Sequence, residues 1–217
     1  SIPGISSLEN PVKTAVPIAQ ALSDMLLNPG KTVDYNGKQI TYPDIKLIYW
    51  AGGNPFTHQM DRNRQIRAWQ KPETIVVNEM YWSSTARFAD IVLPATTTYE
   101  RNDLEGVSEY SGRYLVAMPK LIDPLHEAKD DLEIFREISK RLGFEDKFTE
   151  GKDEMAWLRS FYEEARNQAG SKKINMPDFE TFWSRGYFEF PIPDNARNFV
   201  RHADFRNDPA TNALGTP

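Results

Sequence analysis

The sequence contains no cysteine, and it has only three histidines among its 217 residues. The absence of cysteine excludes disulfides, thiolate metal sites and cysteine nucleophiles, and it is compatible with either the cytoplasm or an oxidising periplasm. The histidines, His58, His126 and His202, are far apart and form no HExxH motif. No residue of this chain is therefore assigned as a metal ligand, and no Ser-His-Asp or paired-carboxylate arrangement is found that would assign a catalytic residue.

Long apolar runs and basic stripes are also missing. Because no stretch of about 18 apolar residues is present, no membrane span is predicted. The first residues, SIPGISSLENPVK, lack the basic and apolar regions of a signal peptide. A net charge of -5 without a basic stripe argues against a nucleic-acid partner. The 40% hydrophobic and 26% charged fractions are those of a globular protein, and the length allows one large domain.

Three apolar runs dominate the middle of the chain. They are IKLIYWAG (45–52), ETIVVNEM (73–80) and DIVLPAT (90–96). The amphipathic segment 61–70 predicts a helix between the first two runs, and 85–90 predicts a short helical crossover to the third. Strands buried on both faces and connected by helices are typical of a parallel sheet, so three parallel strands are expected.

Other elements are predicted on both sides of these runs. Asn36-Gly37 between short alternating segments predicts a hairpin over 32–42. The polar, turn-rich stretch 97–113 is interpreted as a long functional loop, followed by a short strand at 114–118. Apolar residues at helical spacing predict further helices over 17–27, 130–143, 153–170 and 176–186.

The predicted fold class is α/β, a three-layer αβα arrangement with a mainly parallel sheet that resembles a dinucleotide-binding fold. Residues 1–44 are predicted to form a helix and a hairpin excursion packed on a domain of residues 45–186. Residues 187–217, rich in Pro, Asn, Asp and Arg, are interpreted as a connector toward a further domain. The turn-like ending ALGTP favours a chain cut at a domain edge.

The best candidate site follows the first apolar run. Gly52 and Gly53 allow close approach of a ligand to the backbone, and the next helix offers free N–H groups to a phosphate. Ligands of open α/β sheets lie beyond the carboxyl ends of the strands, so Asn54 is expected to share an edge with Asn78 and Glu79. Glu79 follows Gly53 by 79 − 53 = 26 positions, a spacing that suits an acid binding ribose hydroxyls.

The residues alone leave this site open. GGNP is neither GxGxxG nor GxxxxGK[ST], so the two glycines could instead shape a tight turn that Asn54 caps. His58 is interpreted as a solvated or capping histidine rather than a ligand-binding one. The tryptophans are interpreted as core residues rather than cofactor stackers: Trp50, Trp69, Trp82, Trp157 and Trp183.

Two charged residues have alternative roles. Arg101 could pair with Glu100 or Asp103 on a solvated loop, or bind a diphosphate through its two-pronged guanidinium. Asp131 is most simply an acid in the first turn of its helix, where it stabilises the helix dipole.

Long segments of the chain resemble a known family. IKLIYWAGGNPFTHQMDRNRQIRAWQKPETIVVNEMYW and TARFADIVLPATTTYERNDLE closely resemble the molybdopterin-dependent reductases for dimethyl sulfoxide and trimethylamine N-oxide, a group that includes biotin sulfoxide reductase. The resemblance continues through EAKDDLEIF, FTEGKDEMAWLRSFYEEA and FRNDPATNALGTP, so it covers nearly the whole chain.

This resemblance implies a large, single-subunit, periplasmic enzyme that holds molybdenum between two molybdopterin guanine dinucleotides. Such an enzyme reduces S-oxides or N-oxides with electrons from a cytochrome or quinol donor. The chain resembles the family's third domain, which binds one half of the cofactor, so its partners would be the other domains of the enzyme. The cofactor contacts that the resemblance implies come from Gly53, Asn54, His58, Asn78, Glu79, Arg101 and Asp131.

The chain departs from the family pattern at two places. His58-Gln59-Met60-Asp61 stands where the family usually has His-His-Gln-Asp, and Asn78 stands where it usually has His. The family's serine ligand to molybdenum, and the Tyr and Trp that face the oxo group, have no matching motif here. The isolated chain is therefore expected to be non-catalytic and free of the cofactor. The alternatives are a cofactor-free scaffold for sister domains and an independent nucleotide-binding module.

Overall fold

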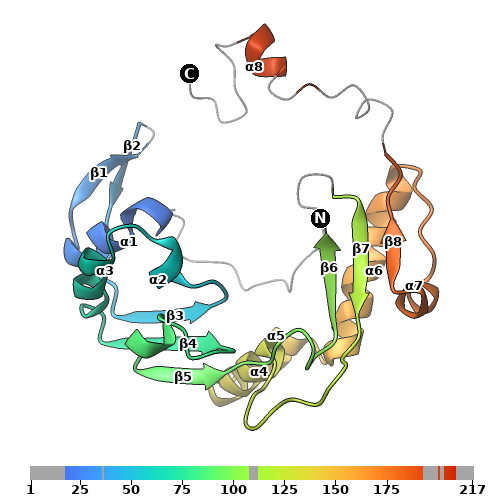
Figure 1. Cartoon of the computed structure of the whole chain (residues 1–217), viewed down its shortest axis with the longest axis horizontal. Helices are drawn as coiled ribbons and strands as arrows, with labels where there is room; N and C mark the ends of the chain where they lie inside the picture. Colours follow the sequence, from blue (N-terminus) through green and yellow to red (C-terminus); the bar gives the residue numbers. More distant parts are fainter. Residues whose placement is uncertain (1–17, 36, 108–111, 193–199, 201–202, 209–217) are drawn as a thin grey trace.

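The computed structural model describes residues 18–35, 37–107, 112–192, 200 and 203–208. Figure 1 shows the arrangement of the elements. The helices are α1 (Ile18–Leu27), α2 (Pro55–His58), α3 (Arg62–Trp69), the 3₁₀ helix η1 (Ala86–Phe88), α4 (Asp131–Arg141), α5 (Glu145–Thr149), α6 (Glu154–Ser171), α7 (Phe179–Arg185) and α8 (Ala203–Asn207). The strands are β1 (Thr32–Tyr35), β2 (Lys38–Thr41), β3 (Leu47–Ala51), β4 (Thr74–Glu79), β5 (Ile91–Pro94), β6 (Asp103–Val107), β7 (Tyr114–Met118) and β8 (Tyr187–Glu189).

The three apolar runs form a parallel sheet in the order β3-β4-β5, as predicted. Its register places Ala51 opposite Asn78, and Asn78 opposite Leu93. The carboxyl ends of all three strands therefore meet at one edge. The sheet is not buried throughout as expected: only β4 is largely buried, while β3 and β5 lie at the sheet edges and are partly exposed.

Helices cover both faces of this sheet. On one face, Trp69 of α3 lies against Trp50 of β3, with ring centroids 5.9 Å apart. On the other face, Phe135 of α4 lies 5.2 Å from the ring of Tyr49. Successive strand residues point to opposite faces, so these two contacts define a helix–sheet–helix sandwich. The predicted α/β class is confirmed.

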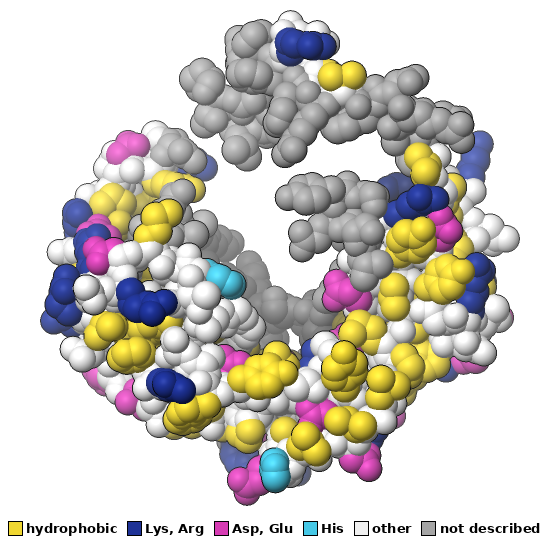
Figure 2. Space-filling model, in the orientation of Figure 1, with side chains coloured by type: hydrophobic (Ala, Val, Ile, Leu, Met, Phe, Trp, Pro, Cys, Tyr) yellow, Lys and Arg dark blue, Asp and Glu magenta, His cyan; other side chains and the backbone are white. Residues whose placement is uncertain are grey.

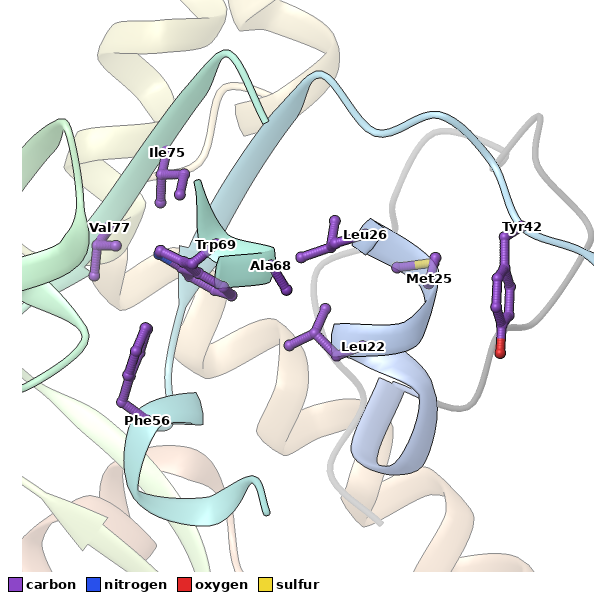
Figure 3. Close-up of a cluster of buried hydrophobic side chains, with 9 residues drawn as sticks. All are labelled: Leu22, Met25, Leu26, Tyr42, Phe56, Ala68, Trp69, Ile75 and Val77. Atoms are coloured by element: carbon purple, nitrogen blue, oxygen red, sulfur yellow. The ribbon is translucent and has the colours of Figure 1, made fainter. Parts of the chain in front are cut away.

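The first core lies between the parallel sheet and the helices α1, α2 and α3, as Figure 3 shows. The hairpin β1–β2 was predicted correctly, and it leads into Tyr42, which is buried in the same core. The helix and hairpin at the N-terminal side therefore add apolar contacts to the sheet domain. The core residues are Leu22, Met25, Leu26, Tyr42, Phe56, Ala68, Trp69, Ile75 and Val77.

A second, antiparallel sheet has the order β6-β7-β8 and packs on α6 and α7. Two sequence predictions are corrected here. The predicted loop 97–113 contains β6, because Leu104 is buried in this second core and the strand pairs with β7 along its whole length. The predicted connector beginning at residue 187 starts with β8, which pairs with β7 and follows Gly186 in its left-handed conformation.

Three helices in the second half of the chain begin at aspartate caps, as α3 does at Asp61. Asp130, Asp153 and Asp178 each accept a hydrogen bond from the backbone N–H three residues later, at the starts of α4, α6 and α7. Such a cap satisfies a donor that the helix itself leaves unpaired. Within the described residues, no helix is both long enough and apolar enough to cross a lipid bilayer.

Candidate functional site

The bend after β3 is open to a ligand. Gly52 and Gly53 have φ angles of +79° and +71°, in the left-handed region that residues other than glycine seldom adopt. Both glycines are exposed, and a Cβ built at either position would have no atom within 4 Å. The glycines are required by the backbone conformation rather than by crowding, and the bend leaves accessible space beside the strand end.

Asn54 occupies the N-cap position of α2, but its side chain makes no capping hydrogen bond. The side-chain oxygen instead accepts a hydrogen bond from the hydroxyl of Thr85, a fully buried residue in the crossover between β4 and β5. This contact joins the loop after β3 to the loop after β4. Asn54 therefore stands at the N-cap position, as the alternative interpretation expected, but its side chain does not cap the helix.

Asn78 connects β4 to the N-terminus of α4. Its side chain is 6% exposed, accepts a hydrogen bond from the Tyr49 hydroxyl at 2.8 Å and donates one to Asp131 Oδ1 at 2.8 Å. Burial of Tyr49 raises the pKa of its hydroxyl, so Tyr49 remains a neutral donor. Two predicted site residues that are 53 positions apart are thus in direct contact.

Glu79, the last residue of β4, stabilises the loop that follows this strand. One carboxylate oxygen accepts a hydrogen bond from the backbone N–H of Met80 at 3.0 Å, and the other accepts one from the Ser83 hydroxyl at 2.6 Å. The side chain is half-buried. Carboxylate oxygens can accept further hydrogen bonds, so Glu79 keeps acceptor capacity for a ligand at this edge.

Arg101 lies beside the end of β5. It donates to the Thr96 carbonyl at 2.7 Å and forms an ion pair with Asp103, with Nε 3.2 Å from Oδ2. The Glu100 carboxylate accepts hydrogen bonds from Thr97 instead. The bond from the Thr97 hydroxyl is the largest cause of the lowered pKa of this carboxyl, and the bond from the Thr97 backbone N–H lowers the pKa further. Of the two alternatives for the partner of Arg101, the structure therefore selects Asp103.

His58 and Asp131 are both exposed, at the end of α2 and the start of α4. A parallel bridge between Ala95 and Lys129 extends the pairing of β5, and it brings the entry of α4 to the same sheet edge. Segments that follow β3, β4 and β5 thus converge with the N-terminus of α4. Among the residues that the structure describes, no group of His, Asp or Glu side chains is arranged to hold a metal ion.

Exposed aromatic residues follow directly after Glu79. Tyr81 and Trp82 are 69% and 65% exposed, so the prediction that Trp82 is a core residue is wrong. It is wrong because the chain leaves the sheet at Glu79 and turns outward before η1. Trp69 and Trp157 are buried as predicted, and the Trp50 indole N–H donates to the Gly52 carbonyl at 2.8 Å, which braces the glycine bend.

Comparison with known proteins identifies the family. The family model described as molybdopterin oxidoreductase matches residues 8–141, which contain every predicted site residue. The chain belongs to the molybdopterin oxidoreductase family. It is 55% identical, over all 217 residues, to a dimethyl sulfoxide/trimethylamine N-oxide reductase of Cereibacter sphaeroides. It is also 49% identical, over 97% of its length, to a trimethylamine-N-oxide reductase of Haemophilus influenzae, and 46% identical, over 99%, to a biotin sulfoxide reductase of Cereibacter sphaeroides.

The chain spans about a quarter of the length of these relatives, 26%, 26% and 28% respectively. Among solved structures, acetylene hydratase from Pelobacter acetylenicus matches 70% of the chain and 19% of that protein, with a TM-score of 0.53 and 20% identity. At this identity the similarity concerns the fold alone. It agrees with the α/β class observed here.

Two residues of the site were not predicted from the sequence. The Tyr49 hydroxyl donates a hydrogen bond to Asn78, 29 positions away in the chain, and the Thr85 hydroxyl donates one to Asn54, 31 positions away. Tyr49 sits inside an apolar run and Thr85 at the start of a crossover, where neither carries a motif. Only the register of β3 against β4, which places Tyr49 next to the strand carrying Asn78, could have indicated the first contact.

Proposed function

We propose that this chain binds one molybdopterin guanine dinucleotide of a bis(molybdopterin guanine dinucleotide) molybdenum cofactor in an S-oxide or N-oxide reductase. The observation that carries the proposal is the convergence of the polar groups after three parallel strands with the N-terminus of α4, joined by the hydrogen bond between Asn78 and Asp131. Dinucleotides bind at this edge of open α/β sheets.

The chemistry of the edge fits a dinucleotide. The glycine bend offers an approachable backbone, Arg101 offers a cation, and Glu79 and Asp131 offer carboxylate acceptors. An arginine suits a diphosphate, while carboxylates suit ribose hydroxyls or the N–H groups of guanine. We assign direct contacts with the dinucleotide to six residues: Gly53, Asn54, His58, Glu79, Arg101 and Asp131. Asn78 would act indirectly, through its hydrogen bond to Asp131.

In the longer protein, the bound molybdenum centre would supply the redox chemistry for removal of oxygen from the substrate. Electrons from a cytochrome or quinol donor, with protons from solvent, would leave that oxygen as water. The role of this chain is to bind and orient one dinucleotide through the edge described above. The names of its relatives support dimethyl sulfoxide, trimethylamine N-oxide or a related oxide as the substrate, and we propose a periplasmic location.

The domain limits inferred from the sequence enter the same proposal. Residues 45–186 would form the cofactor-binding domain, with β8 added to its second sheet, and the segment after β8 would connect it to another domain of the enzyme. The helix and hairpin of residues 18–44 would pack on this domain, while residues 1–17 of the predicted N-terminal segment lie outside the described part of the chain. The isolated chain would be non-catalytic, because we assign no metal ligand to it, and it would lack the molybdenum cofactor when separated from the domains that bind the rest of that cofactor.

A second candidate function is a cofactor-free scaffold that contacts sister domains. Its support is the exposure of large apolar side chains within the described residues, including Tyr81, Trp82, Tyr99, Leu121 and Leu125. Figure 2 shows hydrophobic side chains gathered on the face in view. Exposed apolar surface of this kind is typical of interaction faces.

Calorimetric titration of the chain with GDP, GMP and NAD tests the proposal. If the chain binds the dinucleotide, it should bind guanine nucleotides selectively, even if only with a millimolar dissociation constant. Asp131→Asn should weaken the binding of GDP about tenfold, because a charge-assisted hydrogen bond is lost. Asp146→Asn is the matched control, since Asp146 is also an exposed acid in a first helical turn. A folded chain that binds none of the three ligands would favour the scaffold.

A further inference from the structure

The Tyr49–Asn78–Asp131 chain of hydrogen bonds has only one consistent polarity. Asp131, as a carboxylate, can only accept, so the atom of Asn78 that faces it must be the amide nitrogen. The amide oxygen of Asn78 then faces Tyr49, whose hydroxyl must donate. The direction of each bond therefore follows from the chemistry of the three groups, without any choice of amide orientation.

Tyr49 is anchored to the same helix by its ring. The ring lies 5.2 Å from Phe135, which is 135 − 131 = 4 positions after Asp131 and so on the same face of α4. Tyr49 thus touches α4 through apolar packing and reaches its first turn through Asn78. The tyrosine is held in place by contacts that do not depend on the hydroxyl.

Asn78 has little capacity left for a ligand. It is 6% exposed, its oxygen is used by Tyr49, and its nitrogen is used by Asp131. Asp131, by contrast, is exposed and has one carboxylate oxygen, Oδ2, that receives no hydrogen bond from the described residues. In this chain of hydrogen bonds, the group that a ligand can reach is therefore the Asp131 carboxylate.

We infer that Tyr49 is a positioning residue: its hydroxyl fixes the amide of Asn78, and Asn78 in turn holds the Asp131 carboxylate with Oδ2 turned to the ligand edge. This inference deepens the proposed function, on which it rests, because it names the residues that orient one ligand contact. It assigns Asn78 an indirect role, and it adds a tyrosine that no motif identifies. A pocket between β5 and α4, lined by Leu93, Ile134 and Ile138 among others, includes none of the three hydrogen-bonded residues and takes no part in this arrangement.

Tyr49→Phe tests the inference, because it removes the hydroxyl and keeps the ring against Phe135. In the ¹⁵N-labelled chain, the side-chain NH₂ signals of Asn78 should shift, and their hydrogen exchange should accelerate roughly 2- to 10-fold, the factor that one ordinary hydrogen bond represents. GDP affinity should fall by a similar factor. Tyr114→Phe is the matched control: Tyr114 is also a half-buried strand tyrosine in an aromatic pair, but it lies in the other sheet.

Asn78→Asp provides a second variant. It replaces the NH₂ donor by a carboxylate facing Asp131, so the two like charges repel, and GDP affinity should fall further than in Tyr49→Phe. Unchanged Asn78 signals in Tyr49→Phe, or wild-type GDP affinity in Asn78→Asp, would overturn the inference. Failure of the wild-type chain to bind GDP would instead count against the proposed nucleotide seat, and the Asn78 signals would still decide the role of Tyr49.

Discussion

At the scale of single residues, the ion pair between Arg101 and Asp103 determines how much positive charge the end of β5 presents. The Arg101 side chain is 22% exposed, and one guanidinium N–H group donates to the Thr96 carbonyl. Asp103 therefore competes with any phosphate for the remaining donors. The pair also holds Arg101 in one conformation, which lowers the entropy lost when an anion binds.

Substitutions of the two partners should have opposite effects. Arg101→Ala should lower the ratio of GDP affinity to guanosine affinity roughly fivefold or more, because guanosine lacks the diphosphate and would not feel the loss. Asp103→Asn should raise that ratio at low salt, since it frees the guanidinium. Parallel titrations with both ligands give the ratio. Asp123→Asn, which removes the same charge from an exposed ion pair with Lys120, should leave it unchanged.

The residues of the candidate site differ in how far the sequence predicts them. Asn54, Asn78 and Glu79 follow apolar runs, so their place at the strand ends was predicted from the pattern of the parallel sheet. Their partners were not. Whether Asn78 faces a ligand or Asp131 depends on the packing of α4 on the sheet, and no local pattern records a contact across 53 positions.

At the scale of elements, Asp24 connects three segments of the N-terminal part. Its carboxylate accepts hydrogen bonds from Lys31, which precedes β1, and from Arg64 of α3, and it lies on α1. The hydrogen bond from Lys31 is the largest cause of the lowered pKa of Asp24, against desolvation, and Arg64 and Tyr42 lower it further. This cluster complements the apolar contacts between α1 and α3.

The lowered pKa of Asp24 predicts a pH dependence of stability. Because the folded pKa is below the ordinary 3.8, the carboxylate contributes stability above pH 3.8, and this contribution is lost as the pH falls through the folded value. Asp24→Asn should cost about 1 to 2 kcal/mol in urea unfolding at pH 7, and the difference from wild type should shrink near pH 3. Asp44→Asn, in an exposed pair with Lys46, should cost well under 1 kcal/mol at either pH.

The predicted elements also show where local patterns fail. The apolar runs of β3, β4 and β5 and the aspartate-capped helices carry signals within their own residues, and their positions were predicted within a few residues. The strand β6 reads DLEGV, in which Leu104 and Val107 are the only apolar residues of substantial size. It is a strand because β7 pairs with it and the second core buries Leu104, and both are tertiary effects.

At the scale of the whole molecule, the described residues contain two hydrophobic cores that share no residue. One joins the parallel sheet to α1, α2 and α3, and the other joins the antiparallel sheet to α6 and α7. In Figure 1 the two sheets lie on opposite sides of the molecule, with α4 and α5 between them. Such separate cores are expected to open as separate units in hydrogen exchange.

This arrangement predicts the effect of a mutation in the second core. Phe182 is fully buried and stacks on Tyr162 with ring centroids 4.4 Å apart, so Phe182→Ala should destabilise its unit by about 3 to 5 kcal/mol. Native-state hydrogen exchange should then show faster exchange for the amides of β7 and α6, with those of β4 nearly unchanged. Equal acceleration in both sheets would mean that the chain unfolds as one unit. Tyr99→Ala, at a 63% exposed position, is the control.

The two cores also follow one another along the chain. All residues of the first core lie between Leu22 and Val77, and all residues of the second lie between Leu104 and Phe182. During synthesis, the ribosome therefore releases every residue of the first core before the second is complete. The parallel sheet, whose strands need crossover connections, can form while the antiparallel sheet is still waiting for β8, its last strand. We therefore expect the strands of the parallel sheet to pair with one another before all strands of the antiparallel sheet are available as competing partners.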